Sequence, residues 1–324
     1  MNRFDVVIIG GGAAGLSAAL VLGRARRAVL VVDTGAPRNG PAARLQGFLS
    51  RDGLRPADLL AAGRAEVVGY GGRVAVDTVT GVTGSAVAGF TVDLAAGGRV
   101  LARRLLVATG LRDEIPDIPG LRERWGRDVL HCPYCHGWEV RDRQLGVIAD
   151  GSPDSVRYTQ IVRQWTDDLL LFVPAGNLTE EQRQALAARG VGIVEAGVDR
   201  VLVSDDRLTG VRLAHGEMVR RDALFVPPRF VPNDALLAAL GCDFTRDGWV
   251  VTSSDDRTSV PGVWAAGNVA NPRAQVITAA GEGSAAAISI NASLVDEDVR
   301  DAIAASQRVM APRSGHPAST SLHS

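Results

Sequence analysis

The first 33 residues combine short apolar runs with a glycine-rich turn. Residues 5–9 (DVVII) form a β-branched run closed by glycines, which predicts a buried strand. Residues 14–26 are predicted to form a helix, and residues 28–33 (AVLVVD) a second strand. A strand, a glycine turn, a helix and a strand in this order predict the start of a parallel α/β sheet.

The next hundred residues lose this order before a new unit begins. Residues 36–56 are rich in Pro, Gly and Arg and are predicted to be irregular, and a helix is predicted over residues 57–68. Three strands separated by Gly-rich turns are predicted to form an antiparallel meander, at residues 73–80, 87–94 and 98–108. Residues 111–120 (LRDEIPDIPG) are predicted to be a linker.

A second alternating α/β unit follows this linker. Its strands and helices are predicted in turn at residues 145–149, 154–165, 168–173, 179–189 and 191–195, and the chain stays β-rich to about residue 228. The pattern changes again near residues 240–262, and an Ala-rich helix is predicted at 275–293. The polar stretch 309–324 is predicted to be a disordered tail.

Composition narrows the class of protein. The chain has 324 residues, of which 46% are hydrophobic and 22% charged, with a net charge of −1. These values are typical of a globular protein and predict neither a nucleic-acid nor a membrane partner. Two of the three cysteines lie in one C-x-x-C, which predicts a cytoplasmic, catalytic use rather than a secreted disulfide scaffold.

The first glycine turn predicts a dinucleotide site. In Gly10-x-Gly12-x-x-Gly15, the first glycine permits a tight turn, the second leaves room for a pyrophosphate, and the third lets helix and strand pack closely. Asp33 ends the second strand, where a carboxylate can accept hydrogen bonds from a ribose. Glycines that serve helix packing alone are the competing interpretation.

A second loop near the C-terminus favours FAD over NAD. Ala266-Gly267-Asn268 precedes a helix whose N-terminus can stabilise negative charge on a reduced flavin. An ordinary buried Ala-rich helix explains the alanines but not this loop. Arg38 and Asn39 are further candidates, although an ordinary turn explains them nearly as well. The predicted FAD-binding residues are Gly10, Gly12, Ala13, Ala14, Gly15, Asp33, Arg38, Asn39, Ala108, Thr109, Gly110, Gly267, Asn268, Gln275 and Val276.

The sequence His131-Cys132-Pro133-Tyr134-Cys135-His136 carries the predicted chemistry. Two cysteines three residues apart can close and reopen a small disulfide ring, and the thiolate is the reactive species. Zinc is the competing interpretation, but adjacent Cys–His pairs are poorly placed to bind one ion, so no metal is expected. His136 is the preferred acid–base, and His131 is equally explained as a hydrogen-bonded loop residue. Cys242 is predicted to be a small buried hydrophobe.

Together these motifs resemble the low-molecular-weight thioredoxin reductase family over roughly residues 4–295. The shared stretches are VVIIGGGAAGLSAAL, the VATG at 107–110, the C-x-x-C, and GVWAAGNV with RAQVITAAGEGSAAA. The resemblance implies two Rossmann-like three-layer domains, an FAD domain and an inserted NAD(P)H-type domain, in a homodimer. The expected segments are 1–113 and 247–308 for the FAD domain and 114–246 for the insertion.

The resemblance also implies roles for the central residues. Cys135 would be the flavin-proximal thiol that forms the charge-transfer contact, and Cys132 would be the interchange thiol that attacks the substrate. His136 occupies the position where thioredoxin reductases carry an acidic proton donor.

The chain departs from the family where NADPH binds. The family's second glycine motif is replaced by Ile148-Ala149-Asp150-Gly151-Ser152-Pro153-Asp154, in which only Gly151 matches and Asp150 places a carboxylate near a pyrophosphate. The family's basic cluster for the 2′-phosphate is replaced by residues 173–176, Val-Pro-Ala-Gly. Use of NADPH is therefore doubtful. The FAD-binding Asp of the C-terminal loop is replaced by Asn268.

The stretch CPYCHGWEV is similar to the dithiol oxidases of disulfide natural-product pathways, of the gliotoxin and holomycin kind. The leading hypothesis is oxidation of a small-molecule dithiol through Cys132, Cys135 and FAD, with molecular oxygen as acceptor. The alternatives are NADPH-dependent reduction of a thioredoxin-like protein, a reduced ferredoxin-like donor, and a non-catalytic flavin redox sensor.

Overall fold

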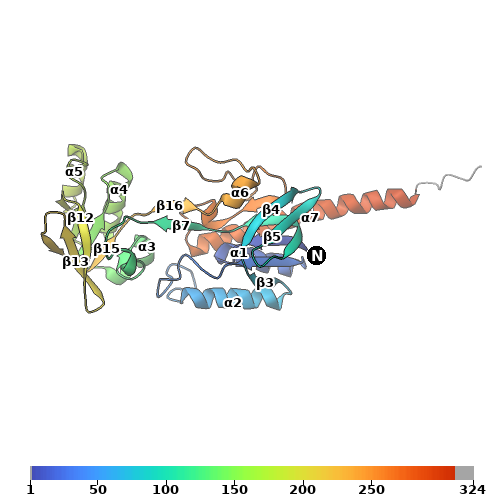
Figure 1. Ribbon diagram of the computed structural model, residues 1–324, viewed down its shortest axis with the longest axis horizontal. Helices are drawn as coiled ribbons and strands as arrows, with labels where there is room; N and C mark the ends of the chain where they lie inside the picture. The colour runs from blue at the N-terminus through green and yellow to red at the C-terminus, as the bar shows by residue number, and fades with distance from the viewer. Residues whose placement is uncertain (1, 311–324) are drawn as a thin grey trace, which may run out of the picture.

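The computed structural model describes residues 2–310 as two lobes joined by a pair of strands (Figure 1). The terminal lobe is built from both ends of the chain, residues 2–110 and 233–310, and the inserted lobe from residues 115–228. The chain crosses between them twice, through β7 (Leu111–Glu114) and β16 (Arg229–Pro232), which pair antiparallel. These two strands are the covalent connections between the lobes, so a change in the orientation of the lobes must bend the chain there.

The terminal lobe has a parallel sheet at its centre. The strand order is β3-β2-β1-β6-β17, with bounds Arg73–Val76, Val29–Asp33, Asn2–Ile9, Arg99–Val107 and Val263–Ala265. The antiparallel strands β4 (Val79–Ser85) and β5 (Gly89–Leu94) extend the sheet, because β5 pairs with the first half of β6 while β17 pairs with its second half.

Alternation along these strands divides the core of the terminal lobe into two layers. Val6 and Ile8 of β1 pack under the helices α1 (Ala13–Arg24), α2 (Pro56–Gly69) and α7 (Val276–Met310). Val7 and Ile9 face the opposite side, where β4, β5 and α6 (Ala235–Ala239) cover the sheet. Successive strand side chains point to opposite faces, so one β-branched run serves both layers.

The inserted lobe repeats the three-layer plan. Its parallel sheet has the order β11-β10-β9-β15-β8, with bounds Gly192–Val194, Leu169–Phe172, Leu145–Ile148, Ala223–Phe225 and Val129–Leu130. Helices α4 (Pro153–Val162) and α5 (Glu180–Ala187) cover one face, and a three-stranded sheet covers the other: β12 (Val198–Ser204), β13 (Arg207–Leu213) and β14 (Met218–Arg220). The short helix α3 (Pro133–His136) carries the cysteine pair. The predicted fold class, α/β with two Rossmann-like three-layer domains, is confirmed.

The antiparallel meander predicted for residues 73–80, 87–94 and 98–108 is wrong at its first strand. Residues 73–76 pair parallel with β2, because α2 carries the chain back across the sheet as a crossover. The predicted strand 73–80 also breaks after Val76, where the amide of Asp77 bonds to the carbonyl of Asp33 and β4 begins as a separate strand. Only β4, β5 and β6 run antiparallel.

Two other boundaries differ from their predictions. The first four residues of the expected linker 111–120 form β7, because β16 supplies partners for their backbone groups. The predicted helix 275–293 continues to Met310, and no glycine or proline interrupts it after Gly283. Residues 309 and 310 of the expected tail therefore end this helix, and residues 311–324 lie outside the described part of the chain.

The expected end of the insertion at residue 246 stays a prediction, and packing favours an earlier end. Leu237 and Cys242 are buried in the same core cluster as Val7 and Val263 of the terminal lobe. No helix within residues 2–310 combines the length and apolarity needed to cross a membrane.

Helices α1 and α7 approach so closely that one position tests their packing. We expect Gly283→Ala to lower the free energy of unfolding by about 1–3 kcal/mol, because the new Cβ would lie 2.0 Å from the carbonyl oxygen of Ala14. Gly281→Ala is the matched control, since no described atom outside its own helix turn lies within 4 Å of its Cβ. Alanine there should leave stability unchanged or raise it by up to about 1 kcal/mol. Equal urea midpoints for the two variants would contradict this packing.

Candidate functional site

The first glycine loop leaves open space where a dinucleotide phosphate fits. A Cβ at Gly10 would lie 2.3 Å from the carbonyl oxygen of Ala108, and one at Gly15 would lie 1.9 Å from that of Gly10. Gly10 also has a φ of +107°. In contrast, no described atom lies within 4 Å of a Cβ at Gly12, the residue directly before α1. The loop is therefore packed from behind and open at the helix N-terminus, as a phosphate requires.

Asp33 is held at the end of β2 by hydrogen bonds from the loops around it. Its Oδ1 accepts from the amide of Gly11 at 3.0 Å, and its Oδ2 accepts from the amide of Gly35 and from Arg64, both at 3.3 Å. Each carboxylate oxygen can accept more than one hydrogen bond. This arrangement fits the predicted ribose contact, which stays a prediction.

Three predicted cofactor segments meet at one edge of the parallel sheet. The amide of Ala108 bonds to the carbonyl of Ile9, and the amide of Ala266 bonds to that of Val107. A Cβ at Gly267, where φ is +76°, would lie 3.0 Å from the Cβ of Ala14. The parallel strands β1, β6 and β17 end side by side, so their following loops share one space.

Other predicted cofactor residues have polar groups that bond within the protein. The hydroxyl of Thr109 donates to the carbonyl of Asn233, and the carbonyl of Gly110 accepts from the amide of the same residue. The Nδ2 of Asn268 donates to two carbonyls, those of Asn271 and Ala274. The carbonyl of Asn39 accepts a hydrogen bond from the amide of Ala42 within a turn. These contacts fix the loops, so any contact they make with the cofactor uses their remaining atoms.

Glu282, which the sequence analysis missed, fixes the C-terminal loop from within α7. Its carboxylate accepts from the amide of Gly267 at 2.9 Å and from Nδ2 of Asn271 at 2.6 Å. A carboxylate in the second turn of an Ala-rich helix carries no signal of this contact in the sequence, because the contact depends on how α7 meets the loop.

The cysteine pair faces this same edge of the terminal lobe. Cys132 and Cys135 form a disulfide at the start of α3, and the amide of Cys135 lies 3.1 Å from Sγ of Cys132. Nε2 of Gln275, which directly precedes α7, lies 4.0 Å from Sγ of Cys135. The inserted lobe therefore directs Cys135 towards the C-terminal loop and the start of α7.

The two histidines beside the cysteines have different surroundings. His131 stacks on Trp125 with ring centroids 5.6 Å apart and meets the edge of Phe230. Burial, and then the neighbouring Arg38 guanidinium, lower the pKa of His131 to about 4. Burial also lowers the pKa of His136, with Glu139 opposing the shift. His131 is therefore neutral near pH 7 and packs between Trp125 and Phe230. This leaves His136 as the candidate acid–base.

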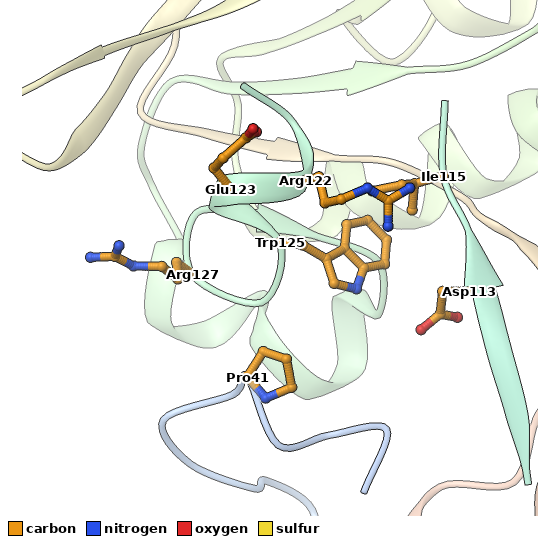
Figure 2. A pocket seen from close by; sticks show the side chains of 7 residues that line it. All are labelled: Pro41, Asp113, Ile115, Arg122, Glu123, Trp125 and Arg127. Carbon is orange, nitrogen blue, oxygen red and sulfur yellow. The ribbon is translucent and has the colours of Figure 1, made fainter. Parts of the chain in front are cut away.

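A cavity of about 500 Å³ is lined in part by Trp125, the residue that stacks on His131. Figure 2 shows the indole of Trp125 and the carboxylate of Asp113 facing the same space, with Pro41 beside them. Arg38 bonds to Asp113 through Nε at 2.9 Å and Nη2 at 2.7 Å. Sequence reasoning missed Asp113, Trp125 and Phe230: Asp113 lies in the predicted linker 111–120, the other two lie in stretches for which no element was predicted, and the three become neighbours only in the folded chain.

In the corresponding nucleotide loop of the inserted lobe, two side chains already accept hydrogen bonds from backbone amides. Oδ1 of Asp150 accepts from the amide of Ser152 at 3.0 Å, and this hydrogen bond lowers the pKa of Asp150. The hydroxyl of Ser152 accepts from the amide of Ser155, and Pro153 has no amide hydrogen to offer. The start of α4 therefore already holds a carboxylate where a pyrophosphate would need to bind.

The segment after β10 is also unsuited to a 2′-phosphate. Residues 173–176 contain no cation, and the amide of Gly176 donates to Glu195 at 3.3 Å. Glu195 is in turn held by both terminal nitrogens of Arg183, each at 2.6 Å. The Gly176 amide and the Arg183 guanidinium are therefore both already paired with Glu195.

The buried His131 predicts a specific pH dependence of stability. The pKa of His131 is 6.5 in the unfolded chain and about 4 in the folded chain. As the pH falls between these values, the unfolded chain binds the proton more readily, so protonation of His131 favours unfolding. Relative to His131→Gln, the wild type should lose roughly 1–2 kcal/mol of unfolding free energy between pH 7 and pH 5. Urea titrations at both pH values measure this difference. His215→Gln, which alters an exposed histidine beside Glu217, should keep the wild-type pH slope. Parallel slopes for His131→Gln and wild type would contradict the burial argument.

Comparison with known proteins gives a consistent picture. The crystal structure of HlmI matches this chain with a TM-score of 0.92 and 56% identity, covering 95% of this chain and 98% of that one. Thioredoxin reductase sirT of Leptosphaeria maculans is 29% identical over 317 residues, 91% of this chain and 96% of its own length. Thioredoxin reductase tcpT of Claviceps purpurea is 32% identical over 279 residues, 82% of this chain and 87% of its own length.

Residues 4–283 match the family described as pyridine nucleotide-disulphide oxidoreductase. The match spans both lobes, the glycine loop and the cysteine pair, and it agrees with the thioredoxin reductase-like fold that the motifs predict. The chain is therefore an enzyme of the pyridine nucleotide-disulphide oxidoreductase family, related to thioredoxin reductases.

Proposed function

We propose that this chain is an FAD-dependent dithiol oxidase that converts a small-molecule dithiol to a disulfide through Cys132 and Cys135, with molecular oxygen as the final acceptor. FAD is the cofactor of this family, and the open space at Gly12, the held carboxylate of Asp33 and the loop before α7 fit it. Bound FAD supplies two-electron chemistry that links a dithiol to oxygen. The predicted FAD-binding residues other than Arg38, and the acid–base role of His136, are part of this proposal.

The observation that carries the direction of the reaction is the Asp150 carboxylate at the start of α4. Its Oδ1 accepts a hydrogen bond from the Ser152 amide, which could otherwise donate to a nucleotide phosphate. Repulsion between this carboxylate and a pyrophosphate opposes NADPH binding, and residues 173–176 offer no cation to offset it. A dithiol is then the natural source of electrons, and the dithiol–disulfide exchange needs no nicotinamide pocket.

Within this chain the steps follow thiol–disulfide exchange. A substrate thiolate attacks Sγ of Cys132, the Cys132–Cys135 bond breaks, and Cys135 leaves as a thiolate near Gln275. The second substrate thiolate attacks the substrate sulfur of the mixed disulfide, which releases the product disulfide and the Cys132 thiolate. His136 accepts a substrate proton in this exchange. The two cysteines then return to the disulfide, and the net reaction converts the dithiol and O₂ to the disulfide and hydrogen peroxide.

The names of two relatives favour a second candidate, NADPH-dependent reduction of a thioredoxin-like protein. Both sirT and tcpT are called thioredoxin reductases, and Gly151 of the nucleotide motif is retained here with a φ of +84°. The Asp150 contact, together with the similarity of the stretch CPYCHGWEV to dithiol oxidases, supports the oxidase as the first candidate.

We also propose that the enzyme is a homodimer, as its family resemblance implies. Helix α7 extends beyond the sheet of the terminal lobe (Figure 1) and leaves apolar side chains exposed along one side. The exposed fractions are 64% for Ile288, 44% for Val295, 52% for Val299 and 53% for Ile303. These positions are spaced by seven and four residues, so they form one stripe that a second copy can cover.

The stripe gives a test of the dimer. The double variant Ile288→Glu with Val299→Glu should shift the protein from dimer to monomer in light scattering after gel filtration, because it buries charge in the interface. Val87→Glu is the control, since Val87 is 99% exposed in the β4–β5 hairpin and should leave the mass unchanged. A monomeric wild type at micromolar concentration would contradict the homodimer.

The oxidase proposal predicts oxygen uptake without any nicotinamide. The FAD-loaded enzyme with dithiothreitol or another small dithiol should consume oxygen and release hydrogen peroxide, as an oxygen electrode and a peroxide assay measure. Under anaerobic conditions the dithiol should bleach the flavin much faster than NADPH does. Rapid bleaching by NADPH, with no oxygen uptake for any dithiol tried, would instead favour the reductase.

Variants of the cysteines separate catalysis from flavin binding. Cys132→Ser should lower turnover by at least about a thousandfold, because the variant cannot form the disulfide that the substrate thiolate attacks. Cys242→Ala should leave turnover unchanged, since Cys242 is buried in the core of the terminal lobe. Unchanged turnover in Cys132→Ser would instead show that the reaction does not pass through the cysteine pair, and absence of turnover with any dithiol in the wild type would favour the non-catalytic flavin sensor.

A further inference from the structure

We propose that Arg38 is a positioning residue that clasps the inserted lobe to the terminal lobe and so holds Cys135 against the flavin. The inference rests on the exchange between FAD and the cysteine pair, which both candidate functions share, and not on the electron acceptor. It assigns Arg38 a role different from the cofactor contact that the sequence predicts.

The guanidinium of Arg38 bonds to residues from three separate segments. It holds Asp113 of β7 through two hydrogen bonds of 2.9 and 2.7 Å, and Nη1 lies 3.4 Å from Oδ1 of Asn268 in the C-terminal loop. Nη2 also lies 3.2 Å from Nε2 of His131. Because a guanidinium can only donate, His131 accepts through Nε2 and carries its proton on Nδ1. One side chain therefore joins the linker strand, the cofactor loop and the residue before Cys132.

Arg38 acts where the two lobes are joined. Asp113 of β7 and Phe230 of β16 are direct partners in the antiparallel pair, and the Arg38 guanidinium lies 5.1 Å from the centre of the Phe230 ring. Phe230 in turn meets the edge of the His131 ring. Arg38 thus contacts both connecting strands at the same pair of partner residues. A change in the orientation of the lobes must bend the chain at these strands.

The same irregular segment contacts the inserted lobe at two further places. Nε2 of Gln46 donates to Glu139, three residues after His136, at 3.1 Å. A Cβ at Gly126 would lie 3.1 Å from the Cβ of Pro41, so these backbones approach closely. Arg38, Pro41 and Gln46 therefore form a clasp along residues 38–46. The ion pair within it is largely shielded from solvent, because the exposed side-chain fractions of Arg38 and Asp113 are 25% and 9%.

The contacts fit a positioning role better than direct cofactor binding. Nε, Nη1 and Nη2 of Arg38 each point at a protein group. Lysine keeps the charge opposite Asp113, but its compact ammonium cannot reach Asp113, Asn268 and His131 at once. Arg38→Lys therefore removes the bridge without leaving a buried carboxylate unpaired, which makes it a milder change than Arg38→Ala.

The test uses a spectroscopic signal that does not depend on turnover. In Cys132→Ser, the free Cys135 thiolate should give a charge-transfer absorbance with the flavin, which requires the sulfur to lie against the ring. Adding Arg38→Lys should lower this absorbance by at least about half at equal FAD content. In the wild-type background, Arg38→Lys should slow anaerobic flavin reduction by dithiothreitol by roughly tenfold to a hundredfold, because misplacement of reacting groups by about 1 Å has effects of this size.

Arg44→Lys is the matched control in the same segment. Arg44 bonds to the carbonyl of Gly53 at an exposed position and should change neither signal. Should Arg38→Lys fold poorly, the double variant Arg38→Gln with Asp113→Asn removes both charges together and should show the same loss of absorbance.

Three results would overturn the proposal. The first is an Arg38→Lys variant that matches Arg44→Lys in both absorbance and reduction rate. The second is loss of FAD itself from Arg38→Lys, which would instead assign Arg38 to cofactor binding. The third is absence of the charge-transfer band in Cys132→Ser alone, because Cys135 would then not lie against the flavin. A failure of oxygen uptake by the wild type would count against the oxidase and leave these anaerobic readouts intact.

Discussion

The close packing of α1 against α7 is the constraint on which the rest of this molecule depends. The two helices come from opposite ends of the chain, and they meet where Gly283 leaves no room for a side chain beside the backbone of Ala14. This contact sets the C-terminal loop next to the glycine loop, so that Gly267 reaches Ala14. Because the proposed flavin site uses both loops, it can form only when both ends of the chain are in place.

The inserted lobe shows how a fold can persist while its ligand contacts change. Its sheet, its covering helices and the glycine at the start of α4 remain, because they are required by the buried strands. The polar groups that a phosphate would use are instead satisfied by Asp150 and Ser152. The fold of this lobe is therefore weak evidence for nicotinamide binding. The hydrogen bond between the Ser152 amide and Asp150 is more informative, because it involves a group that a phosphate would need.

Burial and charge give the redox centre its asymmetry. His131 is enclosed by Trp125, Phe230 and Arg38, and desolvation keeps it neutral. His136 follows the second cysteine, and burial lowers its pKa as well, but Glu139 opposes that shift. Two histidines that look equivalent in the sequence thus have different surroundings: His131 is packed and accepts a hydrogen bond from Arg38, and His136 is the one proposed as the acid–base.

The sequence alone determined the α/β fold class, the glycine loop with Asp33, the cysteine pair and the departures at Asp150, because these depend on local periodicity and on residue types at fixed spacing. It misplaced β3 and the start of the linker, since strand direction depends on which neighbour supplies hydrogen bonds. Only the tertiary structure brought Arg38, Asp113 and His131 together and placed Glu282 under Gly267. The bonded pairs are 15 to 93 positions apart in the sequence, so their contacts arise from packing that no local pattern encodes.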